Sequence, residues 1–180
     1  MLYGVAPPTP KETVQLLEEI FVKKEKLLEM KYVKILEKIR KFFKDMEYGK
    51  VKQISGKEID EILKDTEEYL QRIKKLFYQI DKKREKETVN KIYEDCVKIT
   101  QDVLKDKKVK VEKLSNKLKQ YCEKNKLPIQ LCQSLDNVIK AKEDYQAKKI
   151  TRAEIDKATR EASAFIRFLV EHMQREKSYA

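Results

Sequence analysis

Apolar residues recur three and four positions apart along most of this chain, which is the spacing that puts them on one face of an α-helix. The first such stripe ends just before Gly49, and glycine commonly supplies the left-handed residue that stops a helix. The pattern predicts one long helix over residues 10–47. Its stripe consists of Leu28, Tyr32, Ile35, Ile39, Phe42 and Met46.

A second stripe follows after a short turn and predicts a second long helix, so that the two helices form an αα-hairpin. We expect all of its apolar members to share one face of the helix. They are Ile59, Ile62, Leu63, Tyr69, Leu70, Ile73, Leu76, Phe77 and Ile80.

Three helix starts are marked by a hydroxyl residue followed three positions later by glutamate, which is the capping-box pattern. The pairs are Thr9 and Glu12, Ser55 and Glu58, and Thr151 and Glu154. The last two pairs lie in similar stretches, residues 49–60 and 145–156. That similarity reflects either a duplicated hairpin or convergence on the same capping chemistry.

Residues 81–88 contain no apolar residue, so they form either a solvated stretch of helix or a hinge. Beyond them, helical periodicity predicts a helix that ends near residue 105 and a shorter helix that reaches about residue 121. Two more helices are predicted to start near Pro128 and after Thr151. We therefore expect an all-α bundle of five to six helices. Residues 1–84 form a long N-terminal hairpin and residues 85–180 form a C-terminal helical module.

Composition agrees with this fold class, because hydrophobic and charged residues each make up 41% of the 180 residues, with only three Gly and four Pro. The three cysteines are odd in number and lack CxxC spacing, which favours buried free thiols over disulfides or zinc. The first residues lack a signal-peptide pattern, and no run reaches the roughly 18 apolar residues that span a bilayer. We expect a soluble, cytoplasmic protein without a membrane partner.

Signals for catalysis are sparse. His172 is the only histidine, and the sequence has neither a glycine-rich phosphate loop nor a nucleophile elbow. The acidic start of the second helix lacks the Glu-x-x-His pair of carboxylate-bridged metal sites. We expect no catalytic residues, metal or cofactor, and a protein that is not an enzyme.

Residues 90–174 carry three segments, "KIYEDCVKITQDVLK", "VEKLSNKLKQYCEKNKLP" and "LDNVIKAKEDYQAKKITRAEIDKATREASAFIRFL". Their order resembles that of HEPN-type helical domains. The family's catalytic arginine, polar residue and histidine would fall in "KEDYQA", where this chain has Lys142, Glu143 and Ala147. The resemblance therefore implies a degenerate, non-cleaving relative. The spacing of Arg167 and His172 is similar to the family's RNase motif, which keeps an RNase as a third reading.

Charge gives the sharpest functional signal. Lys and Arg outnumber Asp and Glu by 42 to 31, a net charge of +11, and residues 105–126 hold nine lysines against three acidic residues. Such an excess suggests a polyanionic partner. Lysine lacks the planar fork that reads guanine, and the chain has only seven arginines. We expect contact with the backbone of DNA or RNA at low sequence specificity, through Lys105, Lys107, Lys108, Lys110, Lys113, Lys117, Lys124 and Lys126.

Two other readings of the charge and the helices stay open. The lysines could form only a solubilising surface. The protein could instead be a structural assembly subunit that binds a protein partner, or a second copy of itself, through its long first hairpin.

Overall fold

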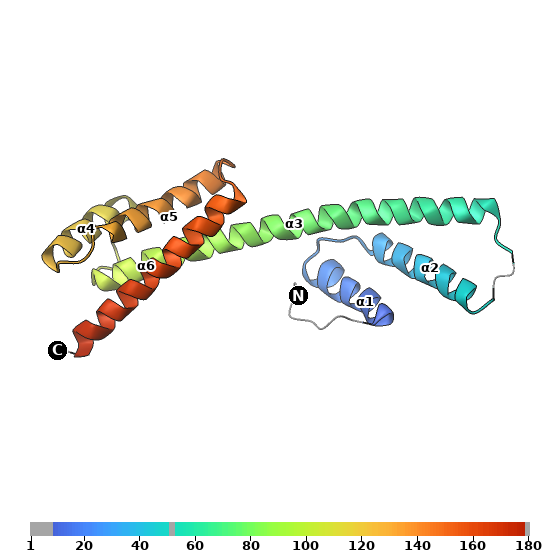
Figure 1. The fold of residues 1–180 in the computed structure, drawn as a ribbon, viewed down its shortest axis with the longest axis horizontal. Helices are drawn as coiled ribbons and strands as arrows, with labels where there is room; N and C mark the ends of the chain where they lie inside the picture. Colours follow the sequence, from blue (N-terminus) through green and yellow to red (C-terminus); the bar gives the residue numbers. More distant parts are fainter. Residues whose placement is uncertain (1–8, 51–52, 179–180) are drawn as a thin grey trace. The chain divides into compact units, whose positions relative to one another are not determined.

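The computed structural model describes residues 9–50 and 53–178 (Figure 1). Over these residues the chain forms six α-helices, one π-helix and no strand, which confirms the all-α fold class. The chain divides into two compact units, Met1–Asp81 and Lys82–Ala180.

The first unit contains α1 (Pro10–Leu16), the π-helix η1 (Leu17–Lys24), α2 (Met30–Glu47) and the beginning of α3 (Gly56–Val103). The prediction of one continuous helix over residues 10–47 is wrong, because the chain leaves the helix between η1 and α2. Lys26 adopts a left-handed φ of 53° there. The backbone N–H groups of Leu27 and Leu28 both donate to the carbonyl of Phe21, which turns the chain back on itself.

Arg72 of α3 holds this break in place. Its Nε donates to Glu29 Oε2 at 2.9 Å, and a terminal guanidinium nitrogen donates to the carbonyl of Leu27. The guanidinium also lies over the ring of Tyr32, and the side chain is only 12% exposed. The Leu27 carbonyl, which lies at the helix break, thus accepts a hydrogen bond from a charged side chain that is distant in sequence.

The core of the first unit is built where α1, α2 and α3 meet. Two ion pairs, Lys31 with Glu68 at 3.0 Å and Lys38 with Asp65 at 2.7 Å, show that α2 and α3 run antiparallel. The buried residues are Val14, Leu28, Tyr32, Val33, Leu76 and Ile80.

The predicted apolar face of α3 is only partly buried. The residues that turn toward the unit's interior, buried or half-buried, are Ile62, Tyr69, Ile73, Leu76 and Ile80. The others are exposed: Ile59, Leu63, Leu70 and Phe77. At about 100° per residue the nine residues share one broad face of α3, as expected, but α2 covers only part of that face.

Residues 81–88 lie inside α3, as the helical alternative predicted. Lysine and glutamate three or four positions apart support the exposed helix here. Lys82 pairs with Glu85 at 2.7 Å and Lys83 pairs with Glu87 at 3.9 Å.

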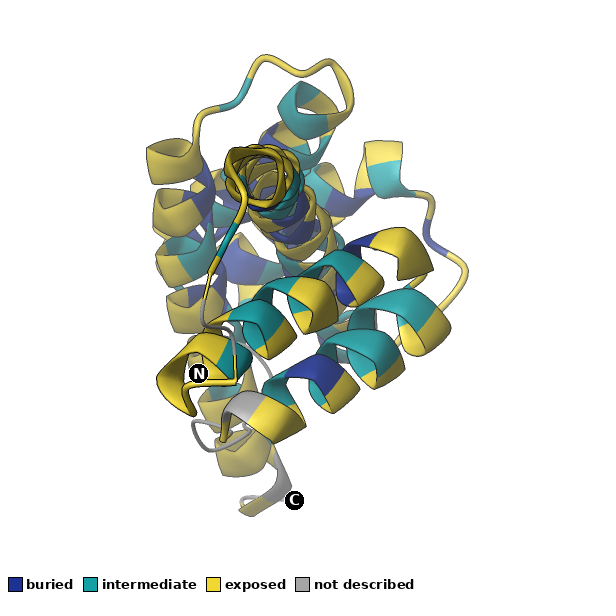
Figure 2. Ribbon diagram, turned by 90° about the vertical axis from the view of Figure 1, so that its right-hand side faces the viewer, coloured by how far each residue is buried: buried dark blue, intermediate teal, exposed yellow. Residues whose placement is uncertain are grey.

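The second unit packs the rest of α3 with α4 (Val111–Lys124), α5 (Gln130–Gln146) and α6 (Arg152–Ser178). Its helices carry buried and exposed residues on opposite sides (Figure 2). The largest fully buried side chains of this unit are Phe165, Leu114, Leu118, Leu135 and Leu169.

All three predicted capping boxes form. In the box at α6, for example, the Thr151 hydroxyl accepts from the Glu154 N–H at 3.4 Å, while the Thr151 N–H donates to the Glu154 carboxylate at 2.7 Å. Thr9 with Glu12 and Ser55 with Glu58 repeat the arrangement. The sequence therefore placed the starts of α1, α3 and α6 correctly.

Left-handed residues end four of the α-helices, and three of these residues are lysines. Gly49 follows α2 with a φ of 64°, as predicted, whereas Lys105, Lys126 and Lys148 follow α3, α4 and α5 with φ of 53°, 57° and 56°. After each, the next N–H reaches back to a carbonyl five residues earlier, as in the Schellman motif. The stops of α2 and α5 do not align in the similar stretches 49–60 and 145–156, so their structural likeness is confined to the helix starts.

Candidate nucleic-acid interface

The lysine-rich segment lies wholly in the second unit. All eight predicted lysines are exposed: Lys105, Lys107, Lys108, Lys110, Lys113, Lys117, Lys124 and Lys126. They extend from the end of α3, through the loop that follows it and along α4, to the second residue after that helix. We call these eight residues the lysine surface.

Helix α4 carries its lysines beside its buried face. Leu114, Leu118 and Cys122 are fully buried at four-residue spacing and attach the helix to the core. Four lysines, which we call the stripe, follow the flank of that face: three on the helix within about 40° of one another at about 100° per residue, and one at the residue just before the helix. They are Lys110, Lys113, Lys117 and Lys124. Another exposed lysine of this helix, Lys119, lies on the opposite flank.

One member of the stripe is already paired. Lys117 Nζ lies 2.7 Å from Asp106 Oδ2, and the ion pair holds the pKa of the Asp106 carboxyl below its usual value. The other Asp106 oxygen accepts from the backbone N–H of Lys108 at 3.2 Å. Within the part of the chain that the structure describes, Lys110, Lys113 and Lys124 make no ion pair. The sequence did not anticipate this difference, because eleven residues separate Lys117 from Asp106.

Tyr121 joins α4 to the end of α6. Its hydroxyl lies 3.0 Å from His172 Nε2 and donates to Glu176 Oε1 at 3.0 Å. Burial, and then the contact with the Glu176 carboxylate, raise the pKa of Tyr121 to about 12. The side chain of His172 is only 17% exposed, and its contact with Tyr121 was not among the sequence predictions.

An open pocket next to this contact is lined by Lys105, His172, Arg175 and Glu176. Lys105 belongs to the lysine surface, whereas Arg175 was not a predicted site residue. Arg175 lies 3.9 Å from Glu171 on its own helix. The pocket adds one arginine at the edge of the basic region.

The residues of the HEPN-type comparison do not form one cluster. Arg167 is exposed on α6, and five residues of helix turn it about 140° away from His172. Lys142 instead donates to Asn90 Oδ1 and lies over the ring of Tyr93 at 5.7 Å. Lys142 therefore serves a contact between α5 and α3.

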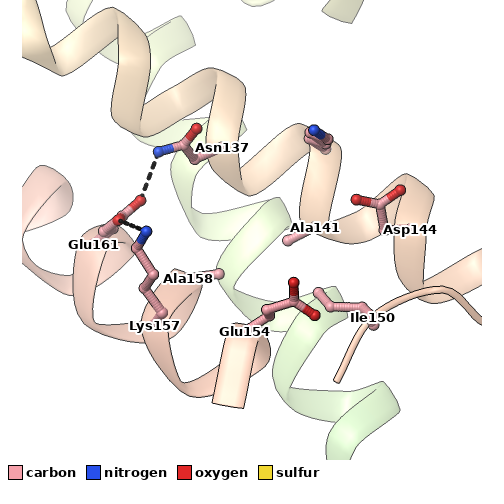
Figure 3. Close-up of a pocket in the computed structure, with 9 residues that line it drawn as sticks. Asn137, Ala141, Asp144, Ile150, Glu154, Lys157, Ala158 and Glu161 are labelled. Carbon is pink, nitrogen blue, oxygen red and sulfur yellow. Dashed lines mark hydrogen bonds and ion pairs between the residues drawn. The ribbon is translucent and has the colours of Figure 1, made fainter. Parts of the chain in front are cut away.

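A groove of about 210 Å³ lies between α5 and α6 (Figure 3). Its polar side chains are largely used by the fold. Asn137 donates to Glu161 at 2.8 Å, Lys157 lies 3.9 Å from the same carboxylate, and Glu154 belongs to the cap of α6. We assign no chemistry to this groove.

The cysteines are buried free thiols, as expected. Over residues 9–50 and 53–178, no group of three or more His, Cys, Asp or Glu is placed to hold a metal ion. None of the helices in the same ranges is both long and apolar enough to cross a bilayer.

No protein-family model, curated protein or solved structure matches the chain. The resemblance of residues 90–174 to HEPN-type domains therefore stays a prediction.

Proposed function

We propose that this protein binds the phosphate backbone of nucleic acids through the lysine surface, without catalysis and with little dependence on base sequence. The observation that carries the proposal is that α4 is fixed to the core by one face while its flank holds four aligned, exposed lysines. Side chains spaced along one helix flank suit a partner with regularly spaced negative charges.

The low sequence specificity follows from the residue types. Lysine contacts a phosphate as a point charge, whereas base reading in the major groove relies mainly on arginine, asparagine and glutamine forks. Single-strand binding proteins stack bases on exposed aromatic rings. The aromatic residue of α4, Tyr121, is half-buried, and its hydroxyl donates a hydrogen bond to Glu176 of α6. We therefore expect duplex DNA, single-stranded DNA and RNA to bind through charge alone.

The number of contacts sets the salt dependence. Three unpaired lysines of the stripe, each neutralising one phosphate, give a log–log slope of about −2.7 on duplex DNA, and four would give about −3.6. Because Lys117 is paired with Asp106, we expect the smaller value from the stripe. Lysines outside α4 would steepen it.

The test is fluorescence anisotropy with a labelled duplex, a single-stranded DNA and an RNA, each at several salt concentrations. The variant replaces Lys110, Lys113, Lys117 and Lys124 with glutamine, which is nearly as good a helix former as lysine. We expect its affinity for duplex at low salt to fall at least tenfold and its salt slope to become shallower.

A matched control removes the same charge elsewhere in the second unit. Lys91, Lys98, Lys140 and Lys149 are also exposed, and replacing them with glutamine should change affinity far less. Equal losses in both quadruple variants would mean that net charge, and not the stripe, causes binding. Absence of binding by the wild type at about 50 mM salt would leave the lysines as a solubilising surface.

A further inference from the structure

The exposed apolar face of α3 has the spacing of a coiled-coil seam. Leu63, Leu70 and Phe77 are seven residues apart and are 61%, 51% and 52% exposed. Ile59 extends the same face by one turn. A seven-residue repeat keeps apolar side chains on one line along a helix, where they can pack into a second helix. Leu63 and Leu70 also line a shallow groove that includes Glu67 and Lys74.

The apolar positions of the seam are symmetric about Leu70. Leu63 lies seven residues before it and Phe77 seven residues after it, while Glu67, three residues before it, and Lys74, four residues after it, carry opposite charges. If an identical helix ran antiparallel across this point, Leu70 would face Leu70 and Leu63 would face Phe77. Glu67 of each copy would lie one residue, or about 1.5 Å along the helix axis, from the position opposite Lys74 of the other, which is within reach of both side chains, so both charged pairs would be attractive.

We propose that residues 63–77 of α3 pair with the same segment of a second copy of this chain in antiparallel orientation. A two-fold interface must be self-complementary, and this segment meets that condition in both its apolar and its charged positions. A parallel pairing in register would place Glu67 beside Glu67 and Lys74 beside Lys74, which repel. The seam lies in the first unit and uses none of the lysine surface, so the proposal is independent of nucleic-acid binding.

The size of the seam indicates a weak dimer. Three half-exposed apolar residues per copy make an interface at or below the lower end of the standard size range. With the entropy lost on association, a dissociation constant on the order of 10 µM is expected. The two charged pairs would lie at the rim, so salt should weaken the dimer.

Sedimentation velocity of the full chain from about 1 to 200 µM measures this equilibrium. We expect monomer at the low end and dimer at the high end, with at least tenfold weaker association for Leu70→Lys, because two ammonium groups would meet at the two-fold axis. Leu70 is half-exposed, so the change leaves the core of the unit intact. Val170→Lys, at an exposed apolar position of α6, should associate like the wild type.

Charge reversal tests the antiparallel register. Glu67→Lys alone and Lys74→Glu alone should each weaken the dimer, since each replaces attraction by repulsion, and the double variant should recover wild-type association. A parallel pairing predicts instead that none of these changes matters, because like charges already face each other. That outcome would overturn the proposed orientation.

Cysteine cross-linking gives a second measurement of the same geometry. Leu70→Cys should form a disulfide-linked dimer under a mild oxidant, while the native thiols stay protected by burial. Leu63→Cys should cross-link poorly with itself but well in a mixture with Phe77→Cys. Self-linking of Leu63→Cys would contradict the antiparallel pairing. A chain that stays monomeric over the whole concentration range would overturn self-association and leave the seam to a different protein.

Discussion

Replacement of Asp106 by asparagine should strengthen nucleic-acid binding, because it releases a lysine that the wild type keeps in an ion pair. Lys117 Nζ lies 2.7 Å from Asp106 Oδ2, and both side chains are nearly half exposed. Such a surface pair stabilises a protein by about 0–1 kcal/mol, so its loss should leave the fold intact. Asparagine also retains the oxygen that accepts from the Lys108 N–H.

The magnitude follows from counterion release. If the stripe contacts three phosphates in the wild type and four in Asp106→Asn, the slope on duplex DNA steepens from about −2.7 to about −3.6. Between 50 and 200 mM salt, the stripe's contribution to affinity would then fall about 40-fold in the wild type and about 150-fold in the variant. Anisotropy titrations at four or more salt concentrations resolve this difference.

Lys117→Gln shows whether the released lysine is responsible. We expect it to change binding little in the wild-type background, where Asp106 already neutralises the amine, and to remove the gain in the Asp106→Asn background. Glu94→Gln, an exposed position of α3 with the same charge change, should leave the slope unchanged. An identical slope in the wild type and Asp106→Asn would refute the contact between Lys117 and phosphate.

Two further predictions concern the fold. Lys148→Gly should stabilise the protein by up to about 1 kcal/mol in thermal or denaturant unfolding, because a φ of 56° is unfavourable for lysine and open to glycine; a decrease in stability would contradict that reading of the α5 stop. Burial raises the pKa of both Cys96 and Cys122 to about 12, so thiol reagents at pH 8 should modify them quickly only after unfolding. Because these pKa values are higher in the folded state, their contribution to stability is complete below the thiols' unfolded pKa and is lost as the pH rises toward 12. Fast labelling of the native protein at both positions, followed by mass spectrometry, would disprove the assigned burial.

The sequence by itself determined the local features of this protein. Capping boxes act over three residues, and a glycine such as Gly49 ends a helix through its own backbone freedom, so the starts of α1, α3 and α6 and the end of α2 could be located correctly. The exposure of the lysine surface was equally predictable, because a charged stripe beside an apolar stripe must face solvent once the apolar side is buried. The sequence did not predict that Lys105, Lys126 and Lys148 would end helices in a left-handed conformation, because no residue-type preference marks lysine for that position.

Tertiary structure decided every feature that depends on contacts between distant residues. The break between η1 and α2 exists because Arg72, more than forty residues away, supplies donors to it. The pairing of Lys117 with Asp106 depends on how α4 returns after its loop. Periodicity identifies which residues of α3 are apolar but cannot tell which of them α2 will cover. Leu70 and its neighbours in the seam are exposed because a single helix, here α2, buries only one side of the helix it packs against.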